Sequence, residues 1–506
     1  MNLWRILETA RDQHGERIAT RGANGGRDYR QLHADAVALA ERLIASGVEP
    51  GHRVALLADN VPAYLDAYFA VAGAGAILVP LNVRLAETEL RRVLADADPS
   101  LLLVAPAHAA RSASLVDAMR RASLPLDIVS GSSRRAAAFV PRLAGGDTPA
   151  QLYFTSGTTG RPKGVILTHR NVATHARAAM NELAIGPSDV WGHIAPLFHL
   201  ADAWATFAMT LAGGRHAFLE RFEPDAALAL MRAEGVTLSN LVPTMIQRML
   251  ARLDAGEPAP TGLRLLLSGG APIAPSVVGR ILDRFGCDYV QTYGLTETSP
   301  YLTLSRLSPA ERRLPREARL ARLARTGRPF ASVEVEVVRP DGASVERNDR
   351  EVGEVRARGA TISPGYWQDA LETRAAHREG WFYTGDLATL DATGSLRIVD
   401  RRKDVILSGG ETIYSIEVEN AILSHPAVLE CAVFGVPDDD LGERVVAAVV
   451  LGSGATVDAA ALVAHCRARI GGFKLPRTIR FLPDLPRTGS GKISKRALRE
   501  TDFDRD

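Results

Sequence analysis

The chain of 506 residues is 46% hydrophobic, enough to bury more than one core, so we expect at least two domains. Its charge is nearly balanced, with 60 basic against 58 acidic residues, which gives no electrostatic reason to expect nucleic-acid binding. Cys287, Cys431 and Cys466 are widely spaced and form no metal-ligand pattern. They fit a reducing cytoplasm and small buried positions.

The N-terminal part contains short apolar runs that end at turn residues, separated by helical stretches. Such runs predict helix-covered parallel strands, at residues 53–57, 100–104 and later 263–268. Residues 67–81 form the longest apolar stretch, but two glycines and a proline interrupt it and it falls short of the roughly 20 residues that span a bilayer. We expect a buried helix followed by a strand. Early charged residues exclude a signal-peptide core, so nothing directs export.

Residues 153–164, with the sequence YFTSGTTGRPKG, combine hydroxyl groups, three glycines and one lysine. Glycines let backbone N–H groups approach an anion, while the hydroxyls and Lys163 add donors and a positive charge. We expect a loop that binds a nucleotide polyphosphate, with a plain surface turn as the alternative. It is not a Walker A motif, because Pro162 precedes the lysine and Gly164 follows it. The surrounding pattern predicts a strand, a loop and a strand, with a helix from about Asn171.

An arginine-rich segment, residues 306–328, holds eight arginines against Glu311 and Glu317. A solvated, charged surface excursion is the first interpretation of this bias, and contact with the phosphates of a bulky anionic substrate is the second. After it, alternating patterns at residues 332–338 and 353–358 predict a more antiparallel, barrel-like part, with a turn at residues 341–342.

After residue 400 the pattern changes to that of a compact α+β unit. The predicted helices and strands are, in turn, helices at 415–423 and 458–468 and strands at 429–434, 444–451 and 477–482. We expect a domain boundary near residues 401–403, where a polar junction would serve as a hinge.

Several segments taken together resemble one known family. The loop at 153–164 is followed by YGLTE (293–297), YTGD (383–386), DRRKD (400–404), SGGE (408–411) and PRTGSGKI (486–493). In this order they resemble the adenylate-forming enzymes, which include acyl-CoA synthetases, adenylation domains of peptide synthetases and luciferases. The resemblance covers nearly the whole chain. It implies a large N-terminal α/β domain of helix-covered sheets with a barrel-like subdomain (1–400), a hinge (401–403) and a small mobile α+β domain (404–506).

Such enzymes activate a carboxylic acid by attack of its oxygen on the α-phosphorus of ATP, so that pyrophosphate leaves and an acyl-adenylate remains. The transition state is densely negative, and positioning and charge neutralisation supply the catalysis. The resemblance implies Mg²⁺ binding by the hard carboxylate of Glu297 and α-phosphate contact by Thr296. Asp386 would accept hydrogen bonds from the ribose, with Arg401 beside it. The implied ATP and AMP contacts are Thr155, Ser156, Gly157, Thr158, Thr159, Gly160, Lys163, Gly269, Gly270, Ala271, Gln291, Thr292, Tyr293, Gly294, Thr296, Asp386, Arg401 and Lys492.

Lys492 lies in a Thr-Gly-Ser-Gly-Lys loop near the C-terminus. The resemblance implies that it bridges the carboxylate and the α-phosphate during adenylation, after which the small domain rotates for thioester formation. Gly409 and Gly410 match the loop that then lines the pantetheine passage, where a missing Cβ leaves room for a narrow chain. Lys403 matches the hinge.

The acid itself is harder to predict. His199 matches a residue beside the acyl carbonyl, and with Gly270 and Trp204 it would line the acyl pocket. Trp204 resembles a tryptophan that gates the tunnel of some long-chain synthetases but is displaced by one position, so a core aromatic is the alternative. Amino-acid adenylating domains usually have aspartate in place of His199, which disfavours amino acids unless Asp202 substitutes. Leu407 stands where luciferases and plant hydroxycinnamate ligases often have lysine, which disfavours a light-emitting reaction.

We therefore predict an AMP-forming acyl-CoA synthetase that uses ATP, Mg²⁺ and coenzyme A. A medium- or long-chain fatty acid is the first candidate substrate and an aromatic acid the second. Transfer of the acyl group to a carrier protein, and a catalytically silent sensor or scaffold, are the alternatives. The expected partners are small molecules in the cytoplasm, without nucleic acid or a membrane span, and the sequence leaves open whether the chain forms a homodimer.

Overall fold

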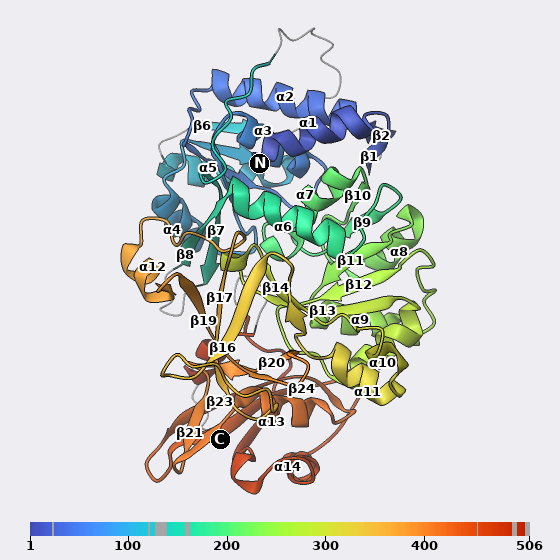
Figure 1. Cartoon of the computed structure of the whole chain (residues 1–506), viewed down its shortest axis with the longest axis vertical. Helices are drawn as coiled ribbons and strands as arrows, with labels where there is room; N and C mark the ends of the chain where they lie inside the picture. Colours follow the sequence, from blue (N-terminus) through green and yellow to red (C-terminus); the bar gives the residue numbers. More distant parts are fainter. Residues whose placement is uncertain are drawn as a thin grey trace.

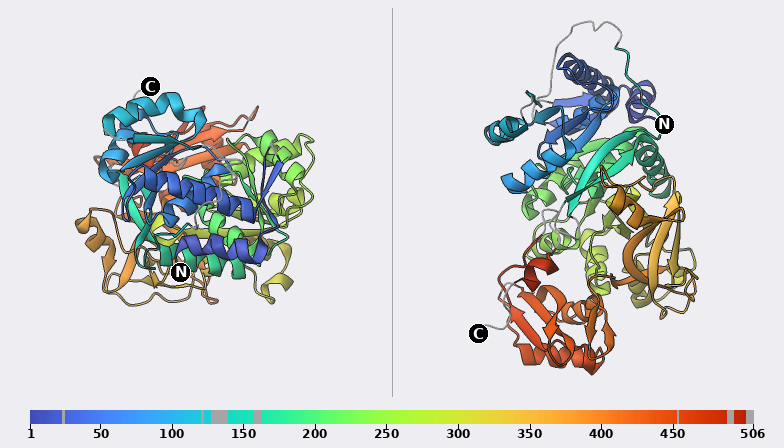
Figure 2. Two further views of the ribbon diagram at one scale, coloured as in Figure 1. Left: turned by 90° about the horizontal axis from the view of Figure 1, so that it is seen from above. Right: turned by 90° about the vertical axis from the view of Figure 1, so that its left-hand side faces the viewer.

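The computed structural model describes residues 1–22, 25–119, 122–126, 139–156, 162–452, 454–487 and 493–500. These residues form a large N-terminal domain and a small C-terminal domain, which lies at the lower end of the molecule in Figure 1 and in the right-hand view of Figure 2. The predicted α/β architecture is confirmed.

One mostly parallel sheet is built from the apolar runs near the N-terminus. In sheet order its strands are β6 (Ala122–Pro125), β5 (Leu101–Val104), β3 (Arg53–Leu57), β4 (Ile77–Pro80), β7 (Pro149–Ser156) and β8 (Pro162–Thr168). Parallel pairing aligns Val54 with both Leu78 and Leu101, and both faces of this central strand, β3, are buried. A continuous apolar run is typical of a strand that is covered on both faces. Helices α4 (Glu87–Ala97) and α5 (Ala109–Met119) cover its outer face.

A second, longer sheet carries most of the predicted site. In sheet order its strands are β15 (Arg328–Pro329), β14 (Tyr301–Leu304), β13 (Asp288–Gly294), β12 (Leu265–Ser268), β11 (Leu238–Leu241), β9 (Val190–His193), β10 (Arg215–Phe218), β1 (Ile18–Gly22) and β2 (Gly25–Asp28). Strands from β13 to β1 are parallel, and the flanking pairs are antiparallel. Its outer face is covered by α8 (Pro224–Glu234), α9 (Pro243–Asp254), α10 (Pro275–Phe285) and α11 (Arg316–Leu323).

A layer of helices between the two sheets shares one core with both of them. Its members are α1 (Leu3–His14), α2 (Tyr29–Ala45), α3 (Ala63–Gly73), α6 (His169–Glu182) and α7 (Leu200–Ala212). Every residue of α3 is buried, and β4 follows it, which confirms the predicted buried helix and strand. Helix α6 begins two residues earlier than predicted, because Thr168 and Asn171 form a reciprocal capping box at its start.

The predicted barrel-like part is a curled antiparallel sheet. Its strands are β16 (Val333–Val338), β17 (Gly353–Gly359), β19 (Trp381–Leu390) and β18 (His377–Arg378), with β20 (Leu396–Arg401) also paired to β19. Helix α12 (Ala370–Ala376) precedes β18. The predicted turn is present, since the N–H of Gly342 donates to the carbonyl of Arg339 at 3.0 Å.

The C-terminal domain has its own sheet and core. Its strands are β22 (Glu411–Ile413), β21 (Ile406–Ser408), β24 (Gly442–Leu451), β23 (Val428–Asp438) and β25 (Thr478–Phe481), and its helices are α13 (Ser415–Leu423), α14 (Ala459–Arg467) and α15 (Lys495–Arg499). Both predicted helices and all three predicted strands of this unit are confirmed. Strand β20 ends at Arg401 and β21 begins at Ile406, so the chain changes sheet at the predicted hinge.

The arginine-rich segment lies at the surface, in agreement with its first interpretation, with only Glu311, Leu323 and Gly327 buried. It forms η3 (Glu311–Arg313) and α11, and several of its arginines are tied to neighbouring elements, as in the pairs Arg316–Asp283 at 2.6 Å and Arg325–Asp349 at 2.9 Å. The cysteines are buried, as predicted. In the described ranges each helix is too short or too polar to traverse a lipid bilayer.

Candidate active site

Predicted nucleotide-binding residues gather where the parallel strands β12 and β13 end. Gln291 donates from Nε2 to the carbonyl of Ala271 at 2.9 Å, and Thr292 donates from Oγ1 to the carbonyl of Ser268 at 3.1 Å. Gly269 is required by this close approach, because a Cβ there would lie 2.4 Å from Oγ1 of Thr292. Ligands of parallel α/β sheets bind beyond the carboxyl ends of strands, so these contacts form one wall of a candidate site.

Tyr293 connects this wall to the barrel-like sheet. Its hydroxyl donates to Oδ2 of Asp386 at 2.8 Å, and Nε of Arg401 lies 3.3 Å from Oδ1 of the same carboxylate. Pairing of β19 with β20 sets Asp386 opposite Arg401. Burial, and then the charge of Asp386, raise the pKa of Tyr293, so the hydroxyl keeps its proton and remains a donor. The structure thus brings three predicted residues together. Tyr293 and Arg401 both contact the carboxylate of Asp386, whose side chain is only 6% exposed.

Two further predicted glycines, Gly270 and Gly294, have local structural reasons. Gly270 has a φ of 84°, in the left-handed region that glycine tolerates. A Cβ on Gly294 would lie 1.8 Å from the carbonyl oxygen of Pro300. The backbone therefore excludes a larger side chain at Gly294, whatever binds in front of it.

Glu297 and Lys163 are connected through a tyrosine. Glu297 lies in η2 (Thr296–Thr298), directly after predicted Thr296, and its Oε1 accepts a hydrogen bond from the hydroxyl of Tyr366 at 2.9 Å. Nζ of Lys163 is 5.5 Å from the centroid of the Tyr366 ring and 2.6 Å from a carboxylate oxygen of Glu372. Burial, and then the charge of Glu297, raise the pKa of Tyr366, which keeps its proton. The predicted magnesium ligand and the loop lysine therefore belong to one connected cluster.

Sequence reasoning missed Tyr366 and Glu372. The segment before α12 is clamped onto β8, because the N–H of Trp367 donates to the carbonyl of Gly164 at 2.7 Å and the N–H of Ile166 donates to that of Gly365 at 3.0 Å. The only sequence signal is SPGYW at residues 363–367, a turn followed by two aromatic residues. Such a turn is too common to indicate a site.

The described residues contain no group of three or more histidine, cysteine or acidic side chains arranged to hold a metal ion. Mg²⁺ in proteins is usually held by one or two carboxylates together with substrate phosphates. The buried carboxylate of Glu297 is a donor of that type. We therefore retain Glu297 as the residue that would hold the ion, next to a bound nucleotide.

His199 is the N-cap residue of α7, and its ring meets that of Phe198 at 4.7 Å. Trp204, on the same helix, is 1% exposed, and its ring packs against that of Trp191 at 5.0 Å, which agrees with the core-aromatic alternative. Asp202 is fully buried, accepting from Nε1 of Trp191 at 3.0 Å and pairing with Nδ1 of His193 at 2.6 Å. An amino-acid ammonium group could not use Asp202 without breaking these bonds, which further disfavours amino acids.

A cavity of about 300 Å³ opens beside Phe198. The guanidinium of Arg84 lies 5.9 Å from the Phe198 ring centroid, and Oδ2 of Asp59 contacts His108 at 2.9 Å and Arg221 at 3.2 Å. These residues come from separate segments and carry no motif, so no sequence pattern could have identified them. The cavity is lined by Phe198, the neighbour in sequence of His199, which we predict to lie beside the acyl carbonyl.

The buried imidazole of His175 makes the stability of the fold depend on pH. It packs against the rings of Trp204, Tyr301 and Phe330 at centroid distances of 5.3, 5.1 and 5.1 Å. Burial lowers the pKa of His175 from 6.5 to about 3. Below about pH 6.5 the unfolded chain therefore takes up a proton on this imidazole, whereas the folded chain does not. The free energy of unfolding falls as the pH drops. His175 alone should lower the free energy of unfolding by about 2 kcal/mol between pH 7 and pH 5.

We expect His175→Phe, which keeps a ring but removes the titrating group, to show a smaller drop in thermal midpoint between pH 7 and pH 5 than the parent protein. His52, on a surface turn where its Nδ1 accepts from the N–H of Glu49 at 3.2 Å, supplies the control His52→Phe. The control should retain the full drop. An unchanged drop in His175→Phe would contradict the assignment.

The glycine pair at the predicted pantetheine passage forms the two-residue turn of the β21–β22 hairpin. Gly409 and Gly410 have φ values of 60° and 81°, and Ser408 pairs with Glu411 across the turn. Two positive φ values are what a type I′ hairpin requires, so the fold alone explains both glycines. A Cβ on Gly410 would meet no atom within 4 Å, so the turn also borders open space. Lys403, the predicted hinge residue, is exposed.

Some predicted residues lie outside the described part of the chain, namely Gly157, Thr158, Thr159, Gly160 and Lys492. On either side of the phosphate loop, β7 and β8 pair antiparallel, with Thr155 opposite Lys163 and Ser156 as the last residue of β7. The predicted strand, loop and strand arrangement is confirmed at its two strands.

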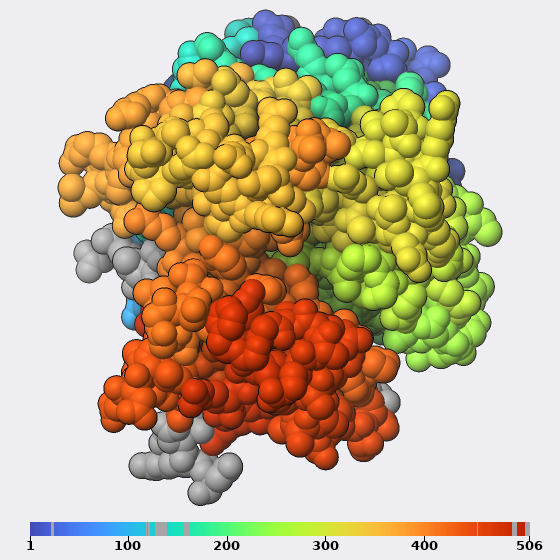
Figure 3. Space-filling model, turned by 60° about the horizontal axis from the view of Figure 1, so that its bottom comes forward, coloured from blue at the N-terminus to red at the C-terminus, as the bar shows by residue number. Residues whose placement is uncertain are grey.

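Figure 3 shows a hollow between the orange-to-red C-terminal domain and the green part of the large domain.

Comparison with known proteins agrees with the two-domain architecture described above. The AMP-binding enzyme family matches residues 7–367, and the AMP-binding enzyme C-terminal domain matches residues 417–492. A feruloyl-CoA synthase from Amycolatopsis sp is 38% identical over 98% of this chain and 98% of that protein. A long-chain-fatty-acid–CoA ligase from Thermus thermophilus is 34% identical over 99% of this chain and 95% of that protein.

Among solved structures, the o-succinylbenzoate CoA synthetase from Bacillus subtilis in complex with its acyl-adenylate intermediate is similar, with a TM-score of 0.87. It is 30% identical, and the match covers 100% of this chain and 99% of that one. The chain therefore belongs to the AMP-binding enzyme family, in the acyl-CoA synthetase branch of the adenylate-forming enzymes, whose CoA ligases use ATP, Mg²⁺ and coenzyme A.

Proposed function

We propose that the chain is an AMP-forming CoA ligase whose substrate is an aromatic carboxylic acid. The similarity to feruloyl-CoA synthase, at 38% identity over 98% of both chains, is the observation that carries this proposal. The structural likeness to an o-succinylbenzoate CoA synthetase supports it. The fatty acid that we predicted first has weaker support, since the long-chain-fatty-acid–CoA ligase is 34% identical.

The packing near the proposed acyl site also favours a compact acid. Tyr301 pairs across the sheet with Gly294, and its ring packs on those of Trp204 and Phe330 at 5.1 and 5.9 Å. All three aromatic side chains are at most 2% exposed. A long acyl chain running in this direction would have to displace well-packed rings, which is costly in a dense core.

In the proposed reaction the carboxylate oxygen attacks the α-phosphorus of ATP and pyrophosphate leaves. The thiol of coenzyme A then loses its proton and attacks the acyl carbonyl, and AMP leaves. Asp386 and Arg401 would hold the ribose, and Lys163, released from Glu372, would bind phosphate. Mg²⁺, held through Glu297, would supply charge neutralisation on the phosphates. Lys492 would bridge the carboxylate and the α-phosphate.

Acid-dependent ATP–pyrophosphate exchange tests the substrate class. We expect ferulate, benzoate or phenylacetate to give a kcat/KM at least about tenfold above that of octanoate and palmitate. A difference of about 1.4 kcal/mol in transition-state binding is enough to produce this tenfold ratio. The best acid, supplied with coenzyme A, should yield AMP and a thioester. Faster exchange with palmitate would contradict the aromatic assignment, and ADP as the main product would contradict the reaction class.

A further inference from the structure

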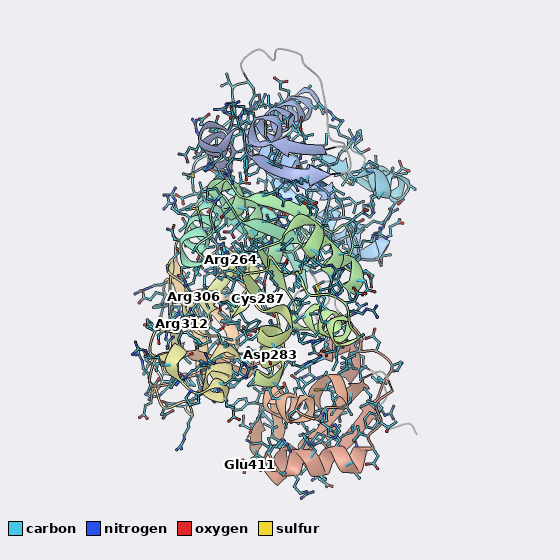
Figure 4. All side chains as sticks on the ribbon, turned by 90° about the vertical axis from the view of Figure 1, so that its right-hand side faces the viewer. Arg264, Asp283, Cys287, Arg306, Arg312 and Glu411 are labelled. Atoms are coloured by element: carbon cyan, nitrogen blue, oxygen red, sulfur yellow. The ribbon has the colours of Figure 1, made fainter. Side chains whose placement is uncertain are left out.

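A second cavity, of about 280 Å³, lies away from the proposed active site. We call it the arginine cavity. It is lined by the amino ends of β12 and β13, by the end of α6 and by the arginine-rich segment around η3 and α11. The proposed catalytic loops follow the opposite, carboxyl ends of the same two strands. Figure 4 shows Arg264, Arg306 and Arg312 around this region, with Cys287 near them. The cavity is therefore separate from the ATP and acid sites proposed above.

The positive charge of the arginine cavity is only partly compensated. Arg264 is held by Asp189 at 2.7 and 2.9 Å, and Arg316 by Asp283 at 2.6 and 2.7 Å. Arg306 donates to the backbone carbonyl of Glu182.

Two other lining arginines, Arg312 and Arg319, form no ion pair within the described ranges, and Nε of Arg319 is buried without a hydrogen-bond partner there. The lining carboxylates are Glu182 and Asp288, so arginines still outnumber carboxylates when the two pairing aspartates are included. A buried guanidinium N–H without a partner favours an anionic ligand.

The floor of the arginine cavity is apolar. Tyr289 and Leu323 are buried in the core beneath it, and Leu307 and Leu320 are packed against that core. An apolar floor under an arginine rim suits a ligand with an apolar body and an anionic head. The volume lies near the lower limit of small-molecule sites, about 300 Å³, so the ligand must be compact. A whole coenzyme A molecule is too large for it.

We propose that the arginine cavity is a second binding site, for a compact organic anion that has an apolar body and a carboxylate or phosphate head. All of its lining cations are arginines, whose planar guanidinium groups bind such heads through two parallel hydrogen bonds. Arg312 and Arg319, from η3 and α11, supply the groups that are free for this contact within the described residues.

Isothermal titration of the full-length protein tests the site with four probes. Phenyl phosphate and phenylacetate carry an apolar body with a phosphate or a carboxylate, inorganic phosphate carries charge alone, and benzyl alcohol carries the body alone. We expect phenyl phosphate or phenylacetate to bind at least about tenfold more tightly than the last two, and the better of them identifies the head group. Equal binding of inorganic phosphate and phenyl phosphate would overturn the proposed ligand class.

Variants locate the binding. Arg312→Glu should weaken the best probe by about tenfold or more, the loss expected for one charged hydrogen-bond partner. Arg313→Glu makes the same charge change one residue away but lies outside the lining, and should leave binding within about twofold. Arg319→Gln provides a second loss-of-binding variant. If the only binding seen persists unchanged in Arg312→Glu and Arg319→Gln, it belongs to the catalytic site and the proposal is wrong.

Discussion

Lys492→Ala should lower acid-dependent ATP–pyrophosphate exchange by about 10²–10³, because it removes one preorganised charge from a densely negative transition state. Thioester formation from supplied acyl-adenylate and coenzyme A should fall far less, since the proposed domain rotation moves this lysine away from the reacting carbonyl. Single-turnover assays of the two half-reactions measure the difference directly.

Lys474→Ala is the matched control on the same domain, where the ammonium of Lys474 pairs with Glu417 at 2.7 Å. It makes the same change of charge and should leave both half-reactions nearly unchanged. If Lys492→Ala, shown to be folded, lost equal activity in both assays, the half-reaction-specific role of this lysine would have to be abandoned.

The fold was predictable where local pattern and tertiary packing agree. The predicted helix at 415–423 coincides with α13, and the apolar run at 53–57 coincides with β3, because each segment is buried on the face or faces that its pattern indicates. The predicted helices and strands differ from the structure only at their boundaries. Strand β23 runs on to Asp438, beyond the predicted end at 434, because antiparallel pairing with β24 continues through its polar end.

The site was predictable only where residues lie in contiguous motifs. The YGLTE and YTGD segments meet through the Tyr293–Asp386 hydrogen bond, which neither segment indicates alone. Tyr366 reaches Glu297 only because its loop is clamped onto β8, and that is a tertiary effect. The glycine pair at 409–410 shows the converse, since a motif with a proposed functional role also has a complete structural explanation in its hairpin.

The substrate was the least predictable feature for a related reason. An acyl pocket is assembled from side chains of several elements, so no short motif encodes its shape. The first candidate substrate was a fatty acid, and the structure places Trp204, a predicted pocket residue, among closely packed rings of the core. The relatives support the aromatic alternative better, because similarity over the whole chain includes many pocket positions rather than one or two.

Gly410→Leu should separate the half-reactions in the opposite sense to Lys492→Ala. If this turn borders the pantetheine passage, a leucine side chain would enter the open space beside it and misplace the thiol, which costs on the order of 10² in rate of thioester formation. Pyrophosphate exchange should remain nearly unchanged. Strain is the competing explanation, since a φ of 81° disfavours leucine. Gly454→Leu controls for it, because Gly454 has a φ of 74° and an equally open Cβ position on the same domain. Loss of thioester formation in both variants would assign the effect to strain, whereas loss in Gly410→Leu alone would assign it to a blocked passage.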